Sequence, residues 1–308
     1  MRIQPKRIVC AIDFSDVSRR ILSYGIILAR EFKAALYVCH VIDLPPAGIY
    51  GEIYIESLVD TLEQVKKIKD YAHKQIGQLI GKQEIKWEPV VLVGSTAEEI
   101  SRMVEEKGID LVIAATHGRA KLKRLILGSV TERLLRTLTC PLLVVESSEA
   151  PVTLPSEPGV SFRKILVGYD FSSNSDMALQ YGLSLAQEFQ SELHLVHVIE
   201  PVLDKSLKQK EKEEEEIRRS LYDGLKARME KMVPEEAPNW CSLKIELISG
   251  KPHEELIHYA LTRQMGLIVL GIRGRGLLET LLLGSTTDRV VRRAPCPVLS
   301  VWPDGDKQ

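Results

Sequence analysis

Residues 7–43 read RIVCAIDFSDVSRRILSYGIILAREFKAALYVCHVID, and residues 164–200 read KILVGYDFSSNSDMALQYGLSLAQEFQSELHLVHVIE. The two stretches align without a gap, at an offset of 157 that brings Asp13 onto Asp170. Both contain an apolar run, an Asp-Phe-Ser turn, a helix-like stretch and a second apolar run. Self-similarity over this length indicates a duplicated domain.

The similarity continues beyond these stretches, with a slip of one residue. At an offset of 156, Gly128 recurs as Gly284, so two copies of one domain fill the chain. The segment between them contains three prolines and little apolar surface, which favours an extended linker. We therefore expect a first domain over residues 1–146, a linker over residues 147–160 and a second domain over residues 161–308.

Each repeat alternates short apolar runs with longer helical stretches. The short runs are rich in branched residues, as strands buried on both faces of a sheet are. Because parallel neighbours need crossover connections, the pattern predicts an α/β fold with two doubly wound domains, each a five-stranded parallel sheet with helices on both faces. In the first repeat the expected strands are Ile8–Ile12, Leu36–Ile42, Pro89–Val93, Leu111–Ala115 and Leu142–Val145, and the expected helices are Ser18–Phe32, Ser57–Ile80, Thr96–Glu106 and Ser129–Leu138.

Composition excludes several classes of function. The 41 Lys and Arg residues balance 42 Asp and Glu residues, which leaves no global positive charge to gather nucleic acid. No apolar run approaches the roughly 18 residues of a membrane span, and Asp13 interrupts the first run too early for a signal peptide. The five cysteines lack the spacing of a disulfide framework or zinc site. We expect a cytoplasmic protein with buried thiols, no membrane span and no DNA or RNA partner.

Two strand ends of the second repeat carry unusual residues. Asp170 follows the first strand, and Gly271-x-x-Gly274 follows the fourth, with nine further residues before Gly284-Ser285. In doubly wound sheets ligands bind beyond the carboxyl ends of the strands. Glycines let a ligand approach the backbone, and a helix beginning with Gly-Ser offers N–H groups to an anion. The pattern indicates a nucleotide-sized site, although a capping or turn role explains Asp170 equally well.

These motifs, with the closing run Ala294-Pro295-Cys296-Pro297-Val298, resemble the universal stress protein family, and their duplication resembles its tandem-domain members. The resemblance implies a sheet ordered 3-2-1-4-5 that holds ATP or another adenine nucleotide between strands one and four. Mg²⁺ could accompany the nucleotide. By the same resemblance, the base and ribose contacts fall on Asp170, Val198, Leu270 and Gly271, and the phosphate contacts on Arg273, Gly274, Gly284, Ser285, Thr286 and Thr287.

The first repeat departs from this pattern. Ala115 stands where Gly271 does, and its methyl group is expected to crowd a nucleotide, while His117 replaces Arg273 and removes a permanent charge. The four basic residues that follow His117 favour the first site, but exposed charges are screened within about 10 Å. We expect the second domain to bind ATP well and the first weakly or not at all. The corresponding positions are Asp13, Val41, Ala114, Ala115, His117, Gly118, Gly128, Ser129, Val130 and Thr131.

Three kinds of function remain open. The first is an ATP-binding stress-response regulatory protein with slow or no hydrolysis, and the second is a non-catalytic scaffold for a protein partner or a hydrophobic ligand. An enzyme is the weakest, because no general base or metal site can be identified. Ser285 and Thr287 could accept a phosphate, since some members of the resembling family autophosphorylate.

Other conspicuous residues have ordinary structural explanations. His40 and His197 occupy matching places in a strand, which favours a packed neutral imidazole over a catalytic one. The Cys-Pro pairs at Cys140 and Cys296 are typical of a turn before the last strand. The charge run over residues 205–219 has i,i+4 pairs, so a solvated helical face accounts for it, with a partner-docking helix as the alternative.

The last strand of each repeat is expected at an edge of its sheet. Unpaired edges are usually paired or covered, and the resembling family pairs this strand between protomers. Leu142–Val145 and Val298–Val301 could therefore pair within one chain as an internal pseudo-dimer, and two chains could also form a homodimer. The loop Leu44–Tyr54 could cover the nucleotide or contact a partner.

Overall fold

The computed structural model describes residues 3–43, 58–117, 127–146, 162–200, 211–272 and 284–302. The chain divides into two compact units, one of residues 4–160 and one of residues 161–308 together with residues 1–3. The expected linker and the loop Leu44–Tyr54 lie outside the described residues.

The first unit alternates strands and helices as the sequence predicts. Every expected element is present, and its bounds differ from the expected ones by at most two residues. The described elements are β1 (Arg7–Ala11), α1 (Val17–Phe32), β2 (Ala35–Ile42), α2 (Leu58–Ile80), β3 (Trp87–Val93), α3 (Thr96–Lys107), β4 (Leu111–Ala115), α4 (Ser129–Thr137) and β5 (Leu142–Val145).

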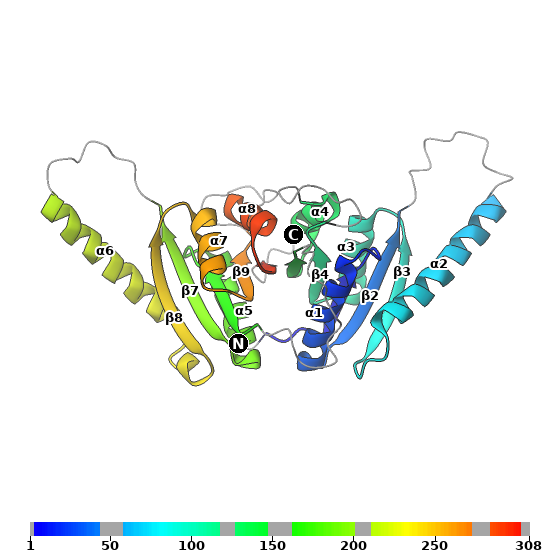
Figure 1. Cartoon of the computed structure of the whole chain (residues 1–308), viewed down its shortest axis with the longest axis horizontal. Coiled ribbons are helices and arrows are strands. Elements are labelled where there is room, and N and C mark those ends of the chain that lie inside the picture. The colour runs from blue at the N-terminus through cyan, green and yellow to red at the C-terminus, as the bar shows by residue number, and fades with distance from the viewer. Residues whose placement is uncertain are drawn as a thin grey trace. The chain divides into compact units, whose positions relative to one another are not determined.

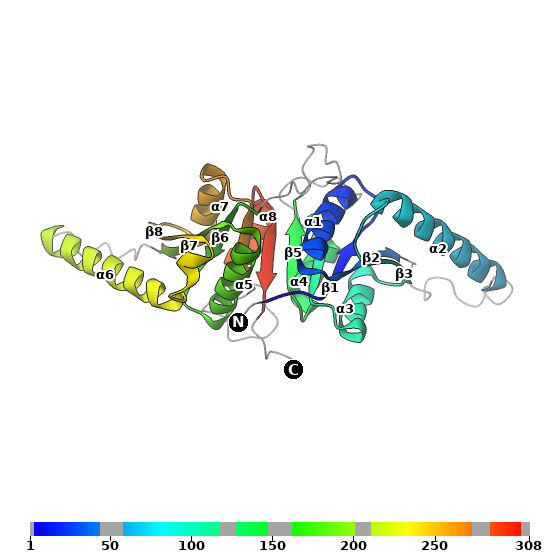
Figure 2. The ribbon, with the colours of Figure 1, turned by 90° about the horizontal axis from the view of Figure 1, so that it is seen from below.

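All strand pairs of the first unit are parallel. β1 lies between β2 and β4, β3 pairs with β2, and β5 pairs with β4, which gives the order 3-2-1-4-5. Helices α1 and α2 cover one face of this sheet and α3 and α4 cover the other (Figure 2). The prediction of a doubly wound parallel sheet is therefore confirmed, and the winding reverses between β1 and β4, where ligands bind in such folds.

The second unit repeats this topology, with β6 between β7 and β9 and with β8 and β10 at the edges. Strands β7, β8 and β9 are labelled in Figure 1. Its elements are β6 (Lys164–Gly168), α5 (Ser173–Phe189), β7 (Glu192–Ile199), α6 (Glu211–Met232), the 3₁₀ turn η2 (Ala237–Asn239), β8 (Ser242–Ser249), α7 (Pro252–Thr262), β9 (Leu267–Gly271), α8 (Ser285–Arg293) and β10 (Val298–Val301). The pairing of β5 with β10 stays a prediction.

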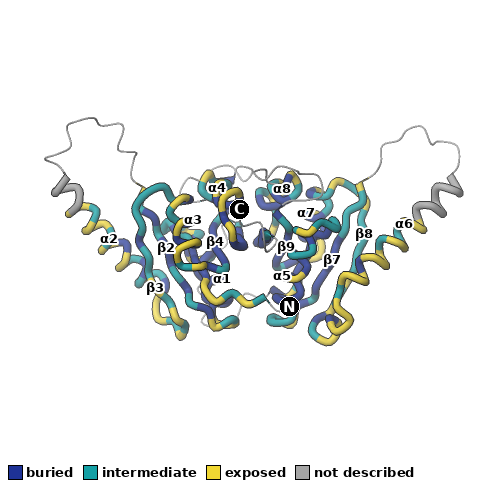
Figure 3. The backbone as a smooth tube through the Cα atoms, turned by 180° about the vertical axis from the view of Figure 1, so that it is seen from behind, coloured by how far each residue is buried: buried dark blue, intermediate teal, exposed yellow. Residues whose placement is uncertain are grey.

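The core of each unit lies along its central strands, which are buried, whereas α2 and α6 carry many exposed residues (Figure 3). Among the described residues, no helix combines the length and the apolar composition of a membrane span. All five cysteines are free and buried, as expected. Burial raises the pKa of Cys39 and of Cys140 to about 12, so both are protonated thiols near neutral pH.

Helices α1 and α5 approach their sheets closely at one matched glycine each. A Cβ atom added at Gly25 would lie 2.3 Å from Cys10 Sγ, and one added at Gly182 would lie 2.4 Å from Val167 Cγ2. Gly224 in α6 differs, because nothing lies within 4 Å of the position of its added Cβ. Packing therefore requires glycine in α5 but not in α6.

We expect Gly182→Ala to lower the free energy of unfolding by about 1–3 kcal/mol, because the methyl group overpacks the sheet. Gly224→Ala is the matched control and should raise the free energy of unfolding by about 0.5–1 kcal/mol, because alanine favours a helix interior. Urea unfolding of the full chain measures both. Equal effects of the two substitutions would contradict the close approach at Gly182.

A buried histidine links β7 to α7 in the second unit. The His194 side chain has Nδ1 2.7 Å from the Tyr259 hydroxyl and Nε2 2.9 Å from a Glu192 carboxylate oxygen. The residue is 1% exposed. Burial lowers the pKa of His194, against the smaller opposing effect of Glu192. The imidazole is therefore neutral near pH 7 in the folded chain.

This burial predicts a loss of stability in mild acid. An unfolded histidine takes up a proton near pH 6.5, whereas folded His194 does so only at a lower pH, so its contribution is present above about pH 6.5 and is lost as the pH falls through the folded pKa. His194→Gln should weaken the pH dependence of the free energy of unfolding between pH 7.5 and 5.5. Identical pH dependence in the variant and the original chain would assign the effect to other groups.

Candidate functional site

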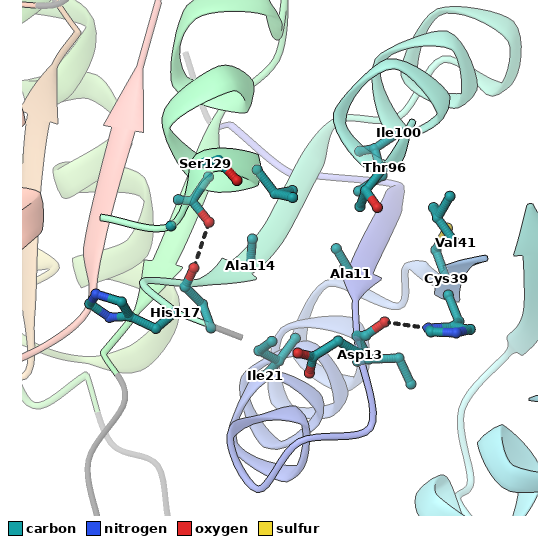
Figure 4. A pocket seen from close by; sticks show the side chains of 16 residues that line it. Ala11, Asp13, Ile21, Cys39, Val41, Thr96, Ile100, Ala114, His117 and Ser129 are labelled. Carbon is teal, nitrogen blue, oxygen red and sulfur yellow. Dashed lines mark hydrogen bonds between the residues drawn. The ribbon is translucent and has the colours of Figure 1, made fainter. Parts of the chain in front are cut away.

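A cavity of about 280 Å³ lies at the carboxyl ends of β1, β2 and β4 in the first domain, with α1, α3 and α4 around it (Figure 4). Most of the first-domain positions predicted from the sequence meet there. They are Asp13, Val41, Ala114, Ala115, His117, Gly128, Ser129, Val130 and Thr131. Gly118 lies outside the described residues. The lining residues that the sequence did not single out for this site are Ala11, Ile12, Ile21, Cys39, His40, Thr96 and Ile100.

The aspartate at the tip of strand one holds the turn that follows it. One carboxylate oxygen of Asp13 accepts the Ser15 N–H at 3.0 Å, the Ser15 hydroxyl and the Ser18 hydroxyl at 3.2 Å. The same oxygen of Asp170 accepts both the N–H and the hydroxyl of Ser172. The turn role that the sequence left open is therefore present in both domains, and a ligand contact by these carboxylates stays a prediction.

The residue after each aspartate has an uncommon backbone conformation. Phe14 and Phe171 have φ values of 61° and 63°, in the left-handed region that bulky residues rarely adopt. Their rings pack against His40 and His197, with ring centroids 4.5 Å and 4.9 Å apart. Each imidazole donates through Nδ1 to the carbonyl of the residue before the aspartate, at 2.9 Å and 2.7 Å. The two histidines thus stabilise the turns, as the packed-imidazole interpretation expects.

Helices α4 and α8 begin at the serine of each Gly-Ser pair, and the glycine is the N-cap residue. The N–H of Gly128 donates to the Thr116 carbonyl at 2.8 Å, and that of Gly284 donates to the Ile272 carbonyl at 3.0 Å. Among the described residues, no side chain caps either helix. The N–H groups of the first turn have no partner within the helix, and the helix dipole favours an anion in front of them. Both helix ends can therefore bind a negatively charged group.

A threonine in the first turn of each helix is used internally. The Thr131 hydroxyl donates to the Ala115 carbonyl at 2.6 Å, and the Thr287 hydroxyl donates to the Gly271 carbonyl at 2.7 Å. These bonds tie the helix to the end of strand four. Thr287 is 4% exposed, whereas Ser285 is exposed, so Ser285 is the more accessible of the two hydroxyls considered as phosphate acceptors.

In the second domain, the predicted base and ribose contacts follow the ends of three strands. Asp170, Val198, Leu270 and Gly271 lie at the ends of β6, β7 and β9. The phosphate contacts Gly284, Ser285, Thr286 and Thr287 form the start of α8. Arg273 and Gly274 lie outside the described residues.

Gly271 has a structural role that sequence reasoning missed. A Cβ added there would lie 2.7 Å from the backbone carbon of Asn174, in the first turn of α5. The glycine therefore lets α5 reach the end of β9. The Oδ1 atom of Asn174 is buried and has no hydrogen-bond partner among the described residues. Such an atom is costly to bury, which points to a missing polar partner beside the strand end.

His117 lines the first-domain cavity at the position where the second repeat has Arg273. Burial lowers the pKa of His117, so its ring is neutral near pH 7.

In the parts of the chain that the structure describes, no group of three or more His, Cys, Asp or Glu side chains is placed to hold a metal ion.

Comparisons with known proteins match both halves of the chain. The universal stress protein family model matches residues 5–146 and again residues 161–301. Universal stress protein MJ0531 of Methanocaldococcus jannaschii is 34% identical over 142 residues, covering 46% of this chain and 82% of that protein. Universal stress protein Slr1230 of a Synechocystis species is 25% identical over 318 residues, covering 96% of this chain and 99% of that protein. The fold also matches a universal stress protein structure from Archaeoglobus fulgidus, with a TM-score of 0.69 at 22% identity, over 98% of this chain and 100% of that chain.

The contact between Gly271 and α5 predicts the effect of a small substitution. Gly271→Ala should lower the free energy of unfolding by about 1–3 kcal/mol, because the methyl group would push the first turn of α5 away from β9. Ala115→Gly, the exchange in the opposite direction in the first domain, should change it by less than about 1 kcal/mol. Urea unfolding measures both, and a neutral Gly271→Ala would argue against the close contact.

Proposed function

The chain belongs to the universal stress protein family, and we propose that it is a stress-response regulatory protein that holds an adenine nucleotide mainly in its second domain. The nucleotide would lie between the ends of β6 and β9. The proposal rests on two groups near these strand ends that lack hydrogen-bond partners among the described residues. They are the N–H groups at the uncapped start of α8 and the buried Oδ1 atom of Asn174.

The residues of the second domain fit the parts of a nucleotide. The N–H groups at the start of α8 suit phosphate oxygens, and the exposed Ser285 hydroxyl adds a donor. Asp170 suits ribose hydroxyls, because a carboxylate accepts hydrogen bonds. The sequence adds Arg273, which carries a permanent charge that His117 lacks in the first domain. These differences favour the second domain over the first.

The proposal includes slow or no hydrolysis of the nucleotide. Fast phosphoryl transfer needs a group that positions water and a metal that neutralises charge. The described residues offer no cluster that would hold a metal. Occupancy of the site, rather than turnover, would then carry the signal.

A partner-binding scaffold is the second candidate. Tyr71 on α2 is 65% exposed and Leu221 on α6 is 50% exposed, and exposed apolar side chains on helices can contact partners. This function needs no nucleotide, so the nucleotide content of the purified chain separates the two candidates.

We expect the denatured protein to release close to one equivalent of adenine nucleotide per chain, identified by mass and counted by absorbance. Asp170→Asn keeps the oxygen that accepts from Ser172 but removes the charge, and it should weaken nucleotide affinity at least tenfold, about 1.4 kcal/mol. Asp13→Asn is the matched control and should leave affinity unchanged.

Arg273→His introduces the first-domain residue and should also lower affinity, more for ATP than for adenosine. Equal losses in the Asp13 and Asp170 variants would overturn the preference for the second domain. A chain that is purified empty and does not take up added ATP would favour the scaffold.

A further inference from the structure

The two domains differ in the pair of residues at the ends of strands one and four. The strand register pairs Cys10 with Ile113 and Val167 with Val269, so the next residues along the strands are Ala11 and Ala114 in the first domain and Gly168 and Leu270 in the second. A Cβ added at Gly168 would lie 2.5 Å from a methyl carbon of Leu270. In the second domain, the leucine side chain of strand four therefore occupies the space beside a glycine of strand one, whereas the first domain has two alanines at these positions.

The leucine occupies space that the alanines leave open. In the second domain, Leu270 and Leu256 of α7 both lie against the Cβ position of Gly168, with Leu256 at 3.2 Å. In the first domain, Ala11 and Ala114 line the cavity instead, together with Thr96 and Ile100 from α3 (Figure 4). The first-domain cavity therefore extends between the strand ends and α3 as an apolar recess, defined by these four residues.

The size and the polar groups of the cavity limit its ligand. An engineered apolar cavity of about 150 Å³ holds benzene, and pockets for whole small molecules begin near 300 Å³. At about 280 Å³, the cavity suits a compound of two fused rings. The start of α4 has no side-chain cap and offers its first N–H groups to an anion. Val130 stands there in place of Thr286, and the His117 ring adds no charge near pH 7.

We propose that the first-domain cavity binds a planar, apolar ring compound that carries a single anionic group. The ring lies in the recess against Ala11, Ala114 and Ile100, and the anion faces the first N–H groups of α4. This cavity lies in the first domain and the proposed nucleotide site in the second, so the two proposals can be tested independently.

The probe for this test is 1-anilinonaphthalene-8-sulfonate, an aromatic sulfonate whose fluorescence rises in apolar surroundings. Naphthalene-2-sulfonate, a planar compound of two fused rings with one anionic group, should displace it. The double variant Ala11→Gly/Ala114→Leu introduces the pair of the second domain, fills the recess and avoids the clash that a leucine would make with Ala11. It should weaken saturable binding of the probe to the full chain at least tenfold. Gly77→Ala in α2 is the control, because Gly77 lies outside the cavity and nothing is within 4 Å of the added methyl group, so it should keep the affinity within about threefold.

Thermal unfolding of both variants checks that the first domain stays folded. The nucleotide content of the second domain is counted in the same samples, which separates this test from that of the proposed function. Unchanged probe binding in a folded double variant would overturn the proposal. Displacement of the probe by ATP at lower concentration than by naphthalene-2-sulfonate would also overturn it, because the cavity would then prefer a polyanionic nucleotide.

Discussion

Each domain depends on the turn that follows its first strand. One oxygen of an aspartate holds the turn, and an imidazole packs on a phenylalanine whose backbone is left-handed. Such a conformation costs about 1–3 kcal/mol and persists only where the surroundings fix it. The turn directs the chain from the end of strand one into the first helix. It therefore sets one edge of the space between strands one and four of each domain, where ligand contacts are predicted.

Both domains keep this turn, but the residues at the ends of strands one and four differ between them. The ends of strands one and four lie side by side, so the side chains there must share a limited volume. The second domain combines Gly168 with Leu270, and the first domain has Ala11 and Ala114 at the corresponding positions. Because interiors are close-packed, a change in volume on one strand is felt by its neighbour. Both residue pairs are compatible with the fold, but they leave different amounts of space beside the strand ends. The two domains therefore differ in the residues beside the ends of strands one and four, although they share one architecture.

The sequence predicts the elements and the parallel sheet well, because strands buried on both faces appear as short continuous apolar runs between helical stretches. The strand order 3-2-1-4-5 is implied by the resemblance to the family. It also predicts most of the cleft, since Asp13, Gly128 and Ser129 follow strand ends that must meet at one edge of a sheet. It does not predict the recess, because Thr96 and Ile100 lie on a helix that looks ordinary in sequence. The contact between Leu270 and the position beside Gly168 becomes visible only in the structure.

Gly271 illustrates how one residue can satisfy two constraints. Its position after strand four suits the approach of a ligand, and its missing side chain also lets α5 rest on the strand end. The same contact brings Asn174 and its unpartnered oxygen to that strand end, among the described residues. In the first domain, Ala115 stands in this place and α1 begins one residue later in the repeat, at Val17 rather than at the counterpart of Ser173. The glycine therefore links the packing of a helix to the chemistry of the site, and losing it would alter both.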